Sequence, residues 1–165
     1  MIKIIKPPKA LPIHRVNGIV PYSIFLAGSI ELGLAKNWQE EITDVIVEAN
    51  KTTVYDAYIF NPRRDDWDST WEQKGQNKPF FDQVSWELTA LDIAEKIIMY
   101  FDENTKSPIS LLELGLYANT KKLMVCCPDK FWRKGNVDIV CERYNIPVCT
   151  HLQSLLDEFK HNILK

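Results

Sequence analysis

SIFLAGS (Ser23–Ser29) is a short apolar run that ends in a glycine and a serine. An uninterrupted apolar run of this length is typical of a strand buried on both faces, and Gly-Ser is typical of the turn that follows such a strand. Strands buried on both faces occur in parallel sheets that are covered by helices. We therefore expect helices alternating with further strands of the same kind.

The rest of the chain alternates in this way. Four more apolar runs favour strands: VYDAYIF (54–60), IIMYF (97–101), KLMVCC (122–127) and PVCT (147–150). Apolar residues at helical spacing, or a helix-start signal, mark the segments 31–49, 84–94, 107–118, 136–144 and 151–164. The alternation predicts an α/β fold with a parallel five-stranded sheet and helices on both faces. We place this single domain at residues 23–165, after an irregular arm (1–22) with four of the nine prolines.

Composition narrows the class of protein. A chain of 165 residues, 45% hydrophobic and 25% charged, suits one domain with one core. Its net charge of −2 favours neither polymeric nucleic acid nor a membrane surface as a partner. The start, MIKIIKPPKALP, is not typical of a signal peptide, and no stretch reaches the length of an apolar transmembrane helix. We expect a cytoplasmic protein that binds small molecules.

The four cysteines are expected to be reduced core residues. They show neither CxxC nor the Cys/His spacing of a zinc site: Cys126, Cys127, Cys141 and Cys149. We therefore predict no metal site.

Ligands of parallel α/β sheets bind beyond the carboxyl ends of the strands. The loops at that edge are expected to be Gly28–Ser29, the segment from Asn61 onward, 102–107 and 127–136. The segment 61–80 is long, polar and interrupted by Gly and Pro, which is typical of functional loops. Within it NPRRDDWD offers Asp66 and Trp67, with Trp67 as a stacking surface for a base; a salt-bridged surface loop is the alternative.

The helix SPISLLELGLYA (Ser107–Ala118) places one acid, Glu113, among leucines and isoleucines. A buried acid costs several kcal/mol unless it is paired or hydrogen-bonded. Ser107 followed by Pro108 predicts a helix start, where the hydroxyl caps the helix or the free N–H groups bind an anion or hydroxyl. Glu113 follows six residues later, roughly 9 Å along the helix. A structural glutamate bonded to backbone or arginine, or a surface position, is an equal alternative at this point.

A second acid, Glu87, lies on the preceding helix near Gln83 in QVSWELTALD. Paired carboxylates are typical of glycosyl transfer, where one acid attacks the anomeric carbon and the other handles the proton of the leaving group. Taken alone, Glu87 fits a solvated helix residue better than a catalytic acid.

The motifs IFLAGSI, NPRR, QVSWEL, SPISLLELG and FWRKGNVDIVCERYNIPV together resemble the nucleoside 2-deoxyribosyltransferase family, in its deoxyribosyltransferase-like branch, over residues 23–150. The resemblance implies a flavodoxin-like fold and transfer of deoxyribose between nucleobases through a covalent deoxyribosyl-glutamate, without a cofactor. It implies that Glu113 is the nucleophile, that Glu87 handles the proton, and that Gly28 and Ser29 line the floor. It further implies that Asn136 reaches the site of a neighbouring subunit in a homo-oligomer.

Two positions depart from the family pattern. Ile24 stands where many members have a tyrosine, and Ser107 replaces an aspartate that binds the sugar hydroxyl. A serine there resembles the related 2′-deoxynucleoside 5′-monophosphate N-glycosidases, in which it holds the phosphate. Hydrolysis of such monophosphates, with Arg63 and Arg64 as further phosphate contacts, is therefore an alternative function. A catalytically inactive nucleotide-binding module is the third.

Overall fold

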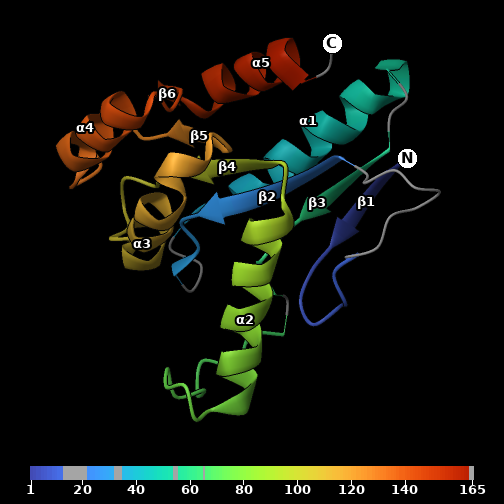
Figure 1. Ribbon diagram of the computed structural model, residues 1–165, viewed down its shortest axis with the longest axis vertical. Helices are drawn as coiled ribbons and strands as arrows, with labels where there is room; N and C mark the ends of the chain where they lie inside the picture. The colour runs from blue at the N-terminus through green and yellow to red at the C-terminus, as the bar shows by residue number, and fades with distance from the viewer. Residues whose placement is uncertain (13–21, 32–34, 54–55, 65, 164–165) are drawn as a thin grey trace.

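A computed structural model describes residues 1–12, 22–31, 35–53, 56–64 and 66–163. Its centre is a six-stranded sheet in the order β1-β3-β2-β4-β5-β6, with every neighbouring pair parallel (Figure 1). The strands are β1 (Ile2–Ile5), β2 (Tyr22–Gly28), β3 (Ala57–Phe60), β4 (Lys96–Tyr100), β5 (Leu123–Cys126) and β6 (Val148–Cys149). The α/β class with a parallel sheet is thereby confirmed, with one strand more than predicted.

The extra strand is β1, which corrects the expectation of an irregular arm for residues 2–5. Its residues pair in parallel with β3, from Ile2 beside Ala57 to Ile5 beside Phe60. The segment IKII is short and is followed by Lys6 and two prolines, so its pattern alone does not indicate a strand. Pairing with the free edge of β3 supplies the hydrogen bonds that a strand needs. Residues 13–21 of the predicted arm lie outside the described residues.

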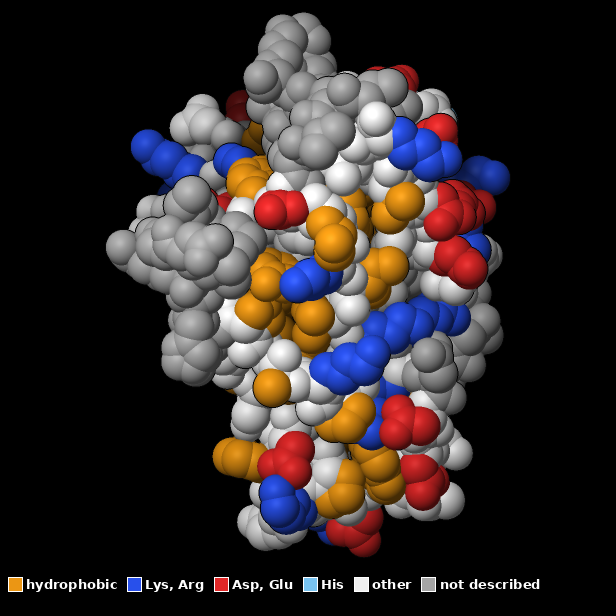
Figure 2. Space-filling view, turned by 90° about the vertical axis from the view of Figure 1, so that its right-hand side faces the viewer, with side chains coloured by type: hydrophobic (Ala, Val, Ile, Leu, Met, Phe, Trp, Pro, Cys, Tyr) orange, Lys and Arg blue, Asp and Glu red, His pale blue; other side chains and the backbone are white. Residues whose placement is uncertain are grey.

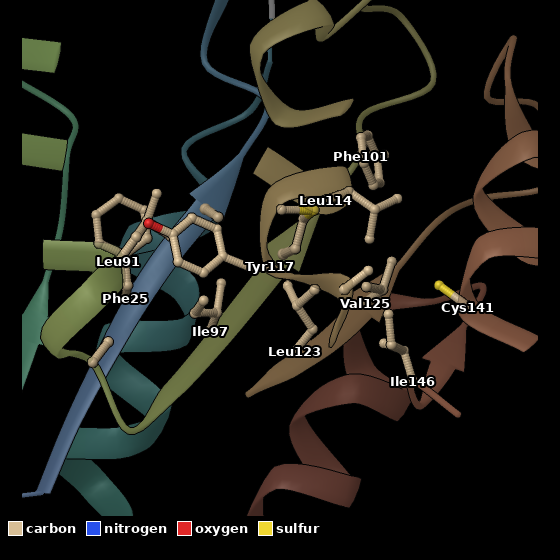
Figure 3. Close-up of a cluster of buried hydrophobic side chains, with 14 of the residues drawn as sticks. Phe25, Leu91, Ile97, Phe101, Leu114, Tyr117, Leu123, Val125, Cys141 and Ile146 are labelled. Atoms are coloured by element: carbon tan, nitrogen blue, oxygen red, sulfur yellow. The ribbon is translucent and has the colours of Figure 1, made fainter. Parts of the chain in front are cut away.

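The helices cover both faces of the sheet. They are α1 (Trp38–Thr53), α2 (Lys78–Ile93), α3 (Pro108–Tyr117), α4 (Lys134–Tyr144) and α5 (Leu152–Ile163), with the short 3-10 turn η2 (Ala118–Thr120) after α3. Side chains alternate along each strand, so that Phe25 of β2 belongs to the core shared with α2, α3 and α4, whereas Ile24 belongs to the core shared with α1 and α5. Figure 3 shows the first of these two cores, to which Leu91, Tyr117 and Val125 belong.

The described surface shows no large patch of one charge on the face in Figure 2, as expected from the small net charge. On the side of the molecule at the right of Figure 1, basic and acidic side chains are interspersed with apolar ones (Figure 2). Among the described residues no helix combines the length and hydropathy needed to cross a bilayer. All four cysteines are free, and three of them are buried.

The strand order defines where the chain changes direction across the sheet. From β2 it first goes to β3 on one side and then, through α2, to β4 on the other side. The carboxyl ends of β2 and β4 are therefore neighbours, with Gly28 paired to Tyr100. Such a switch point is where ligands of open α/β sheets bind.

Gly28 is required at this junction. Its φ of +134° lies in a region that favours glycine, and a Cβ built there would be 2.1 Å from the Tyr100 carbonyl oxygen. The loops after β2 and β4 can therefore approach closely only if position 28 has no side chain.

We expect Gly28→Ala to lower the free energy of unfolding by about 2 kcal/mol or more, because the strained φ and the clash with Tyr100 add. Urea unfolding measures this loss. Gly115→Ala is the control: it lies within α3 with no atom within 4 Å of its added Cβ. It should be neutral or stabilise the protein, and equal losses in both variants would contradict the argument.

Candidate active site

A cluster of three buried hydroxyls lies at the switch point. The Ser29 and Ser107 Oγ atoms are 2.5 Å apart, and Thr105 Oγ1 lies 2.9 Å from Ser29 Oγ and 2.7 Å from Ser107 Oγ. The backbone N–H of Asp102 also donates to Ser29 Oγ, at 2.8 Å. These bonds tie the turn after β2 to the loop between β4 and α3. Gly28, Ser29 and Ser107 are thus brought together, as the topology predicted.

The predicted capping role of the Ser107 hydroxyl is wrong. Ser107 has a left-handed backbone (φ 46°, ψ 51°), and its side chain makes no capping hydrogen bond to α3. The hydroxyl instead belongs to the cluster with Ser29 and Thr105. Local sequence indicates a cap, but the neighbouring turn offers the hydroxyl buried partners.

A carboxylate already lies at the start of α3. Glu31 Oε1 accepts a hydrogen bond from the backbone N–H of Ser107. An anion at this position is stabilised by the partial positive charge of the helix N-terminus. Sequence analysis did not single out Glu31, because it stands at the beginning of a predicted helix. The only available signal was its position two residues after the Gly-Ser turn.

Glu113 is a buried and unpaired acid. It lies on α3 with 8% of its surface exposed, and its carboxylate has no hydrogen-bond partner among the described residues. Burial, and secondarily the negative charge of Glu87, raises its pKa to about 8. Neither alternative from the sequence is observed, since Glu113 is not on the surface and no described arginine or backbone group holds it.

Glu87 comes from α2 and is half-buried. Burial raises its pKa, whereas a hydrogen bond from Gln83 opposes that rise. Gln83 Nε2 donates to Glu87 Oε1 at 2.7 Å and to the Pro62 carbonyl at 3.2 Å. α2 and α3 therefore bring two desolvated carboxyls into electrostatic contact, with the buried Gln83 fixing one of them.

The segment after β3 reaches Gln83, the partner of Glu87, through one arginine. Arg64 forms two bonds with Asp66, of 2.8 and 2.7 Å, and its guanidinium lies 5.0 Å from the Trp71 ring centre. It also reaches Gln83 Oε1, at 3.5 Å. Trp67 packs edge-on against Trp71, with ring centres 5.1 Å apart. Asp66 and Trp67 thus form one cluster with Arg64, which connects them to Gln83.

Two further predicted site residues, Asn61 and Asn136, make no hydrogen bond to either acid. Asn61 is buried directly after β3, and its side-chain oxygen accepts from the Arg63 N–H at 3.0 Å. Asn136 is exposed on α4, and its side chain makes no hydrogen bond to the described residues. The start of α4 is joined to the loop before α3 by Trp132, whose indole N–H donates to the Lys106 carbonyl at 3.0 Å.

A separate cleft of about 430 Å³ opens at the same edge of the sheet. Its lining consists of Ala35, Lys36, Tyr100, Asp102, Glu103, Asn104 and Pro128. Tyr100 faces the core of α1 and α5, so this cleft does not contain the acid pair. Among the described residues no group of three His, Cys, Asp or Glu side chains is arranged to hold a metal ion.

The fold and the site define an α/β protein of flavodoxin strand order, extended by β1, with two desolvated carboxyls beside its switch point. The family model described as "Nucleoside 2-deoxyribosyltransferase like" matches residues 21–131, most of the chain. The chain belongs to this family, which indicates an enzyme of glycosyl transfer on nucleosides.

A solved structure supports the fold. The "Crystal structure of conserved protein from Enterococcus faecalis V583" superimposes with a TM-score of 0.61 at 12% sequence identity, over 87% of this chain and 100% of that chain. At that identity the likeness concerns the fold alone. No sequence among the curated proteins matches this chain.

The raised pKa of Glu113 makes stability depend on pH. The folded protein holds this proton up to about pH 8, whereas an unfolded glutamate loses it near 4.5. Above pH 4.5 the unfolded state therefore binds fewer protons, so the Glu113 contribution to stability falls as pH rises toward 8. We expect Glu113→Gln to be stabilised relative to the native chain at pH 8.5, by on the order of 3 kcal/mol, with little difference near pH 4.5.

Urea unfolding at several pH values measures this difference. Glu103→Gln, at an exposed position of the loop after β4, is the control for a lost charge and should show no such pH-dependent gain. A Glu113→Gln effect that is the same at all pH values would contradict the desolvation of Glu113.

Proposed function

We propose that this protein is a nucleoside 2-deoxyribosyltransferase, which exchanges nucleobases on 2′-deoxyribose through a covalent deoxyribosyl-glutamate. The observation that carries the proposal is the buried carboxyl of Glu113, which lies near Glu87 and has no hydrogen-bond partner in the part of the chain that the structure describes. Burying an acid without a partner is unfavourable, and such strongly shifted carboxyls are concentrated at catalytic sites. A module that only binds nucleotides does not need a buried unpaired acid, which lowers the stability of the folded protein.

In the first half-reaction a Glu113 oxygen bonds to C1′ of the sugar while the bond from C1′ to the base nitrogen breaks. The departing base takes the electron pair of that bond and a proton from Glu87. In the second half-reaction an incoming base gives its proton to Glu87, and its nitrogen displaces Glu113 from C1′. A 2′-deoxy sugar suits this route because no 2′-hydroxyl opposes the positive charge that develops at C1′.

The two acids share protons as a coupled pair. The positive charge at C1′ favours the ionised form of Glu113, so the proton resides on Glu87. The Gln83 N–H, 2.7 Å from Glu87, then stabilises the carboxylate that remains after the base is protonated. Arg64 beside the Gln83 oxygen keeps the amide in this orientation.

The remaining residues would bind the substrate around this pair. We assign the sugar to the floor formed by Gly28, Ser29 and Ser107, and the base to the side of α2. The groups on the base side are Asn61, Asp66, Trp67 and Gln83. Trp67 and its partner Trp71 offer an aromatic surface on which a base can stack.

The alternative is hydrolysis of 2′-deoxynucleoside 5′-monophosphates by the same acid pair. Ser107 at the start of α3 favours it, but the arginines invoked for the phosphate are engaged elsewhere. Arg64 pairs with Asp66, and Arg63 reaches Gln39 Oε1 at 3.4 Å. The transferase is therefore the better supported proposal.

We expect Glu113→Ala to lower base exchange by at least about 1000-fold, because loss of a covalent nucleophile removes the intermediate. The measurement is chromatography of deoxyadenosine formed from thymidine and adenine, with thymidine 5′-monophosphate alone in a parallel reaction. Glu103→Ala is the matched control and should retain activity. Free thymine and deoxyribose phosphate from the monophosphate, without exchange, would favour the hydrolase. Unchanged exchange by Glu113→Ala would exclude the mechanism.

We also propose a homo-oligomer that shares its active sites, with Asn136 reaching a neighbour's site. The outer face of α3 is apolar: Ile109, Leu112 and Leu116 are 61%, 58% and 56% exposed and lie at helical spacing. Ile139, 66% exposed, is a further exposed apolar residue on α4, the helix that carries Asn136. Exposed apolar surfaces of this kind mark protein interfaces.

We expect the native chain to form a dimer or larger assembly and Leu112→Asp to shift it toward monomer, because a charge in an apolar interface is not solvated. Light scattering at working concentration measures the mass. Val47→Asp, on the outer face of α1, is the control and should not alter the assembly. A monomeric native protein would contradict the proposal.

A further inference from the structure

Two of the four cysteines lie side by side on neighbouring strands. Cys126 ends β5 and Cys149 ends β6, and the parallel register pairs these two residues directly. Paired residues of a sheet point to the same face, so both side chains belong to the core shared with α1 and α5. The other two cysteines, Cys127 and Cys141, belong to the core on the opposite face. Cys126 and Cys149 therefore form a pair that is separated from the other thiols by the sheet.

The spacing of this pair suits a disulfide. Neighbouring strands lie about 4.7–4.9 Å apart, within the range of about 4.4–6.8 Å that separates the Cα atoms of disulfides. The two thiols already interact, because each is the largest influence on the pKa of the other. β6 has only two residues and is the last strand of the sheet, beyond β5 (Figure 1). A small adjustment of β6 can therefore close the bond without rearranging the core.

The two thiols differ in exposure and in acidity. Cys126 is fully buried, whereas Cys149 is only partly buried. The contact with Cys149, together with burial, raises the pKa of Cys126. The contact with Cys126 lowers the pKa of Cys149, and backbone groups of His151 and Leu155 around the start of α5 act in the same direction against burial. Cys149 is therefore the thiol of the pair that ionises first, and the thiolate is the reactive form of cysteine.

A cleft of about 360 Å³ adjoins the pair. Its lining includes Tyr100, which the register places beside Cys126, and Thr150, which follows Cys149 in the chain. His151 and Leu152, at the start of α5, line the same cleft. Solvent therefore comes close to the partly exposed Cys149, and an oxidant little larger than water can reach its sulfur.

We propose that Cys126 and Cys149 are a peroxide-reactive dithiol, which hydrogen peroxide converts to a disulfide between β5 and β6. The Cys149 thiolate attacks one peroxide oxygen, so that an S–O bond forms, the O–O bond breaks, and the departing hydroxide takes a proton from solvent. The Cys126 sulfur then attacks the sulfenic acid on Cys149. The S–S bond forms, the S–O bond breaks, and the hydroxide leaves as water with the Cys126 proton. The two thiols lose two electrons, and the peroxide is reduced to two water molecules.

The test is treatment of the native, full-length protein with a small molar excess of hydrogen peroxide. The remaining thiols are then blocked in denaturant, and the tryptic peptides are identified by mass spectrometry. We expect a crosslink between the peptides 123–130 and 144–160, which dithiothreitol removes, and two of the four thiols left free. Fragment ions of this crosslink distinguish Cys126 from its neighbour Cys127 without any substitution.

Variants test the role of each thiol. Cys126→Ala should abolish the crosslink, and Cys149→Ser should slow the loss of thiols by at least about tenfold, because it removes the more acidic and accessible sulfur. Cys127→Ala is the matched control: it changes a buried cysteine of the same peptide that faces the other core, and it should retain the crosslink.

Four outcomes with the native protein would each overturn the proposal. They are retention of four free thiols, a crosslink through Cys127, a disulfide between two chains on a non-reducing gel, and oxidation of Cys149 to sulfinic acid without a crosslink.

Discussion

The close parallel pairing of β2 with β4 is the constraint on which the rest of the structure depends. Gly28 lies so near the Tyr100 carbonyl that any side chain would clash. This approach lets Ser29, Thr105 and Ser107 form one buried hydroxyl cluster. The cluster fixes the start of α3, and the helix then determines where Glu113 lies.

In the proposed mechanism the acid pair that serves catalysis lowers the stability of the folded protein. Burial raises the pKa of both Glu113 and Glu87, so ionising either one is less favourable in the folded protein than in the unfolded chain. Packing elsewhere compensates, since each face of the sheet has its own apolar core. In the proposed mechanism the raised pKa of Glu87 suits a general acid, which must hold its proton near neutral pH.

Sequence patterns predicted the elements better than the contacts between them. The runs SIFLAGS and IIMYF indicated buried strands, and β2 and β4 confirm them. β1 was missed because its pairing with the edge of β3 is not encoded in four residues. The predicted cap at Ser107 failed, and Glu31 was overlooked, because both depend on a turn 76 residues away in the chain.

The sequence by itself determined the α/β class, the edge of the sheet at which polar residues gather, and the presence of an acid within an apolar helix. These follow from periodicity and residue type, which are local properties. Only the tertiary structure decided that Glu113 is buried beside Glu87 with no hydrogen-bond partner among the described residues, and that Glu31 lies at the start of α3. Burial and electrostatic contact depend on distances between separate elements, and those distances are set by packing of the whole sheet.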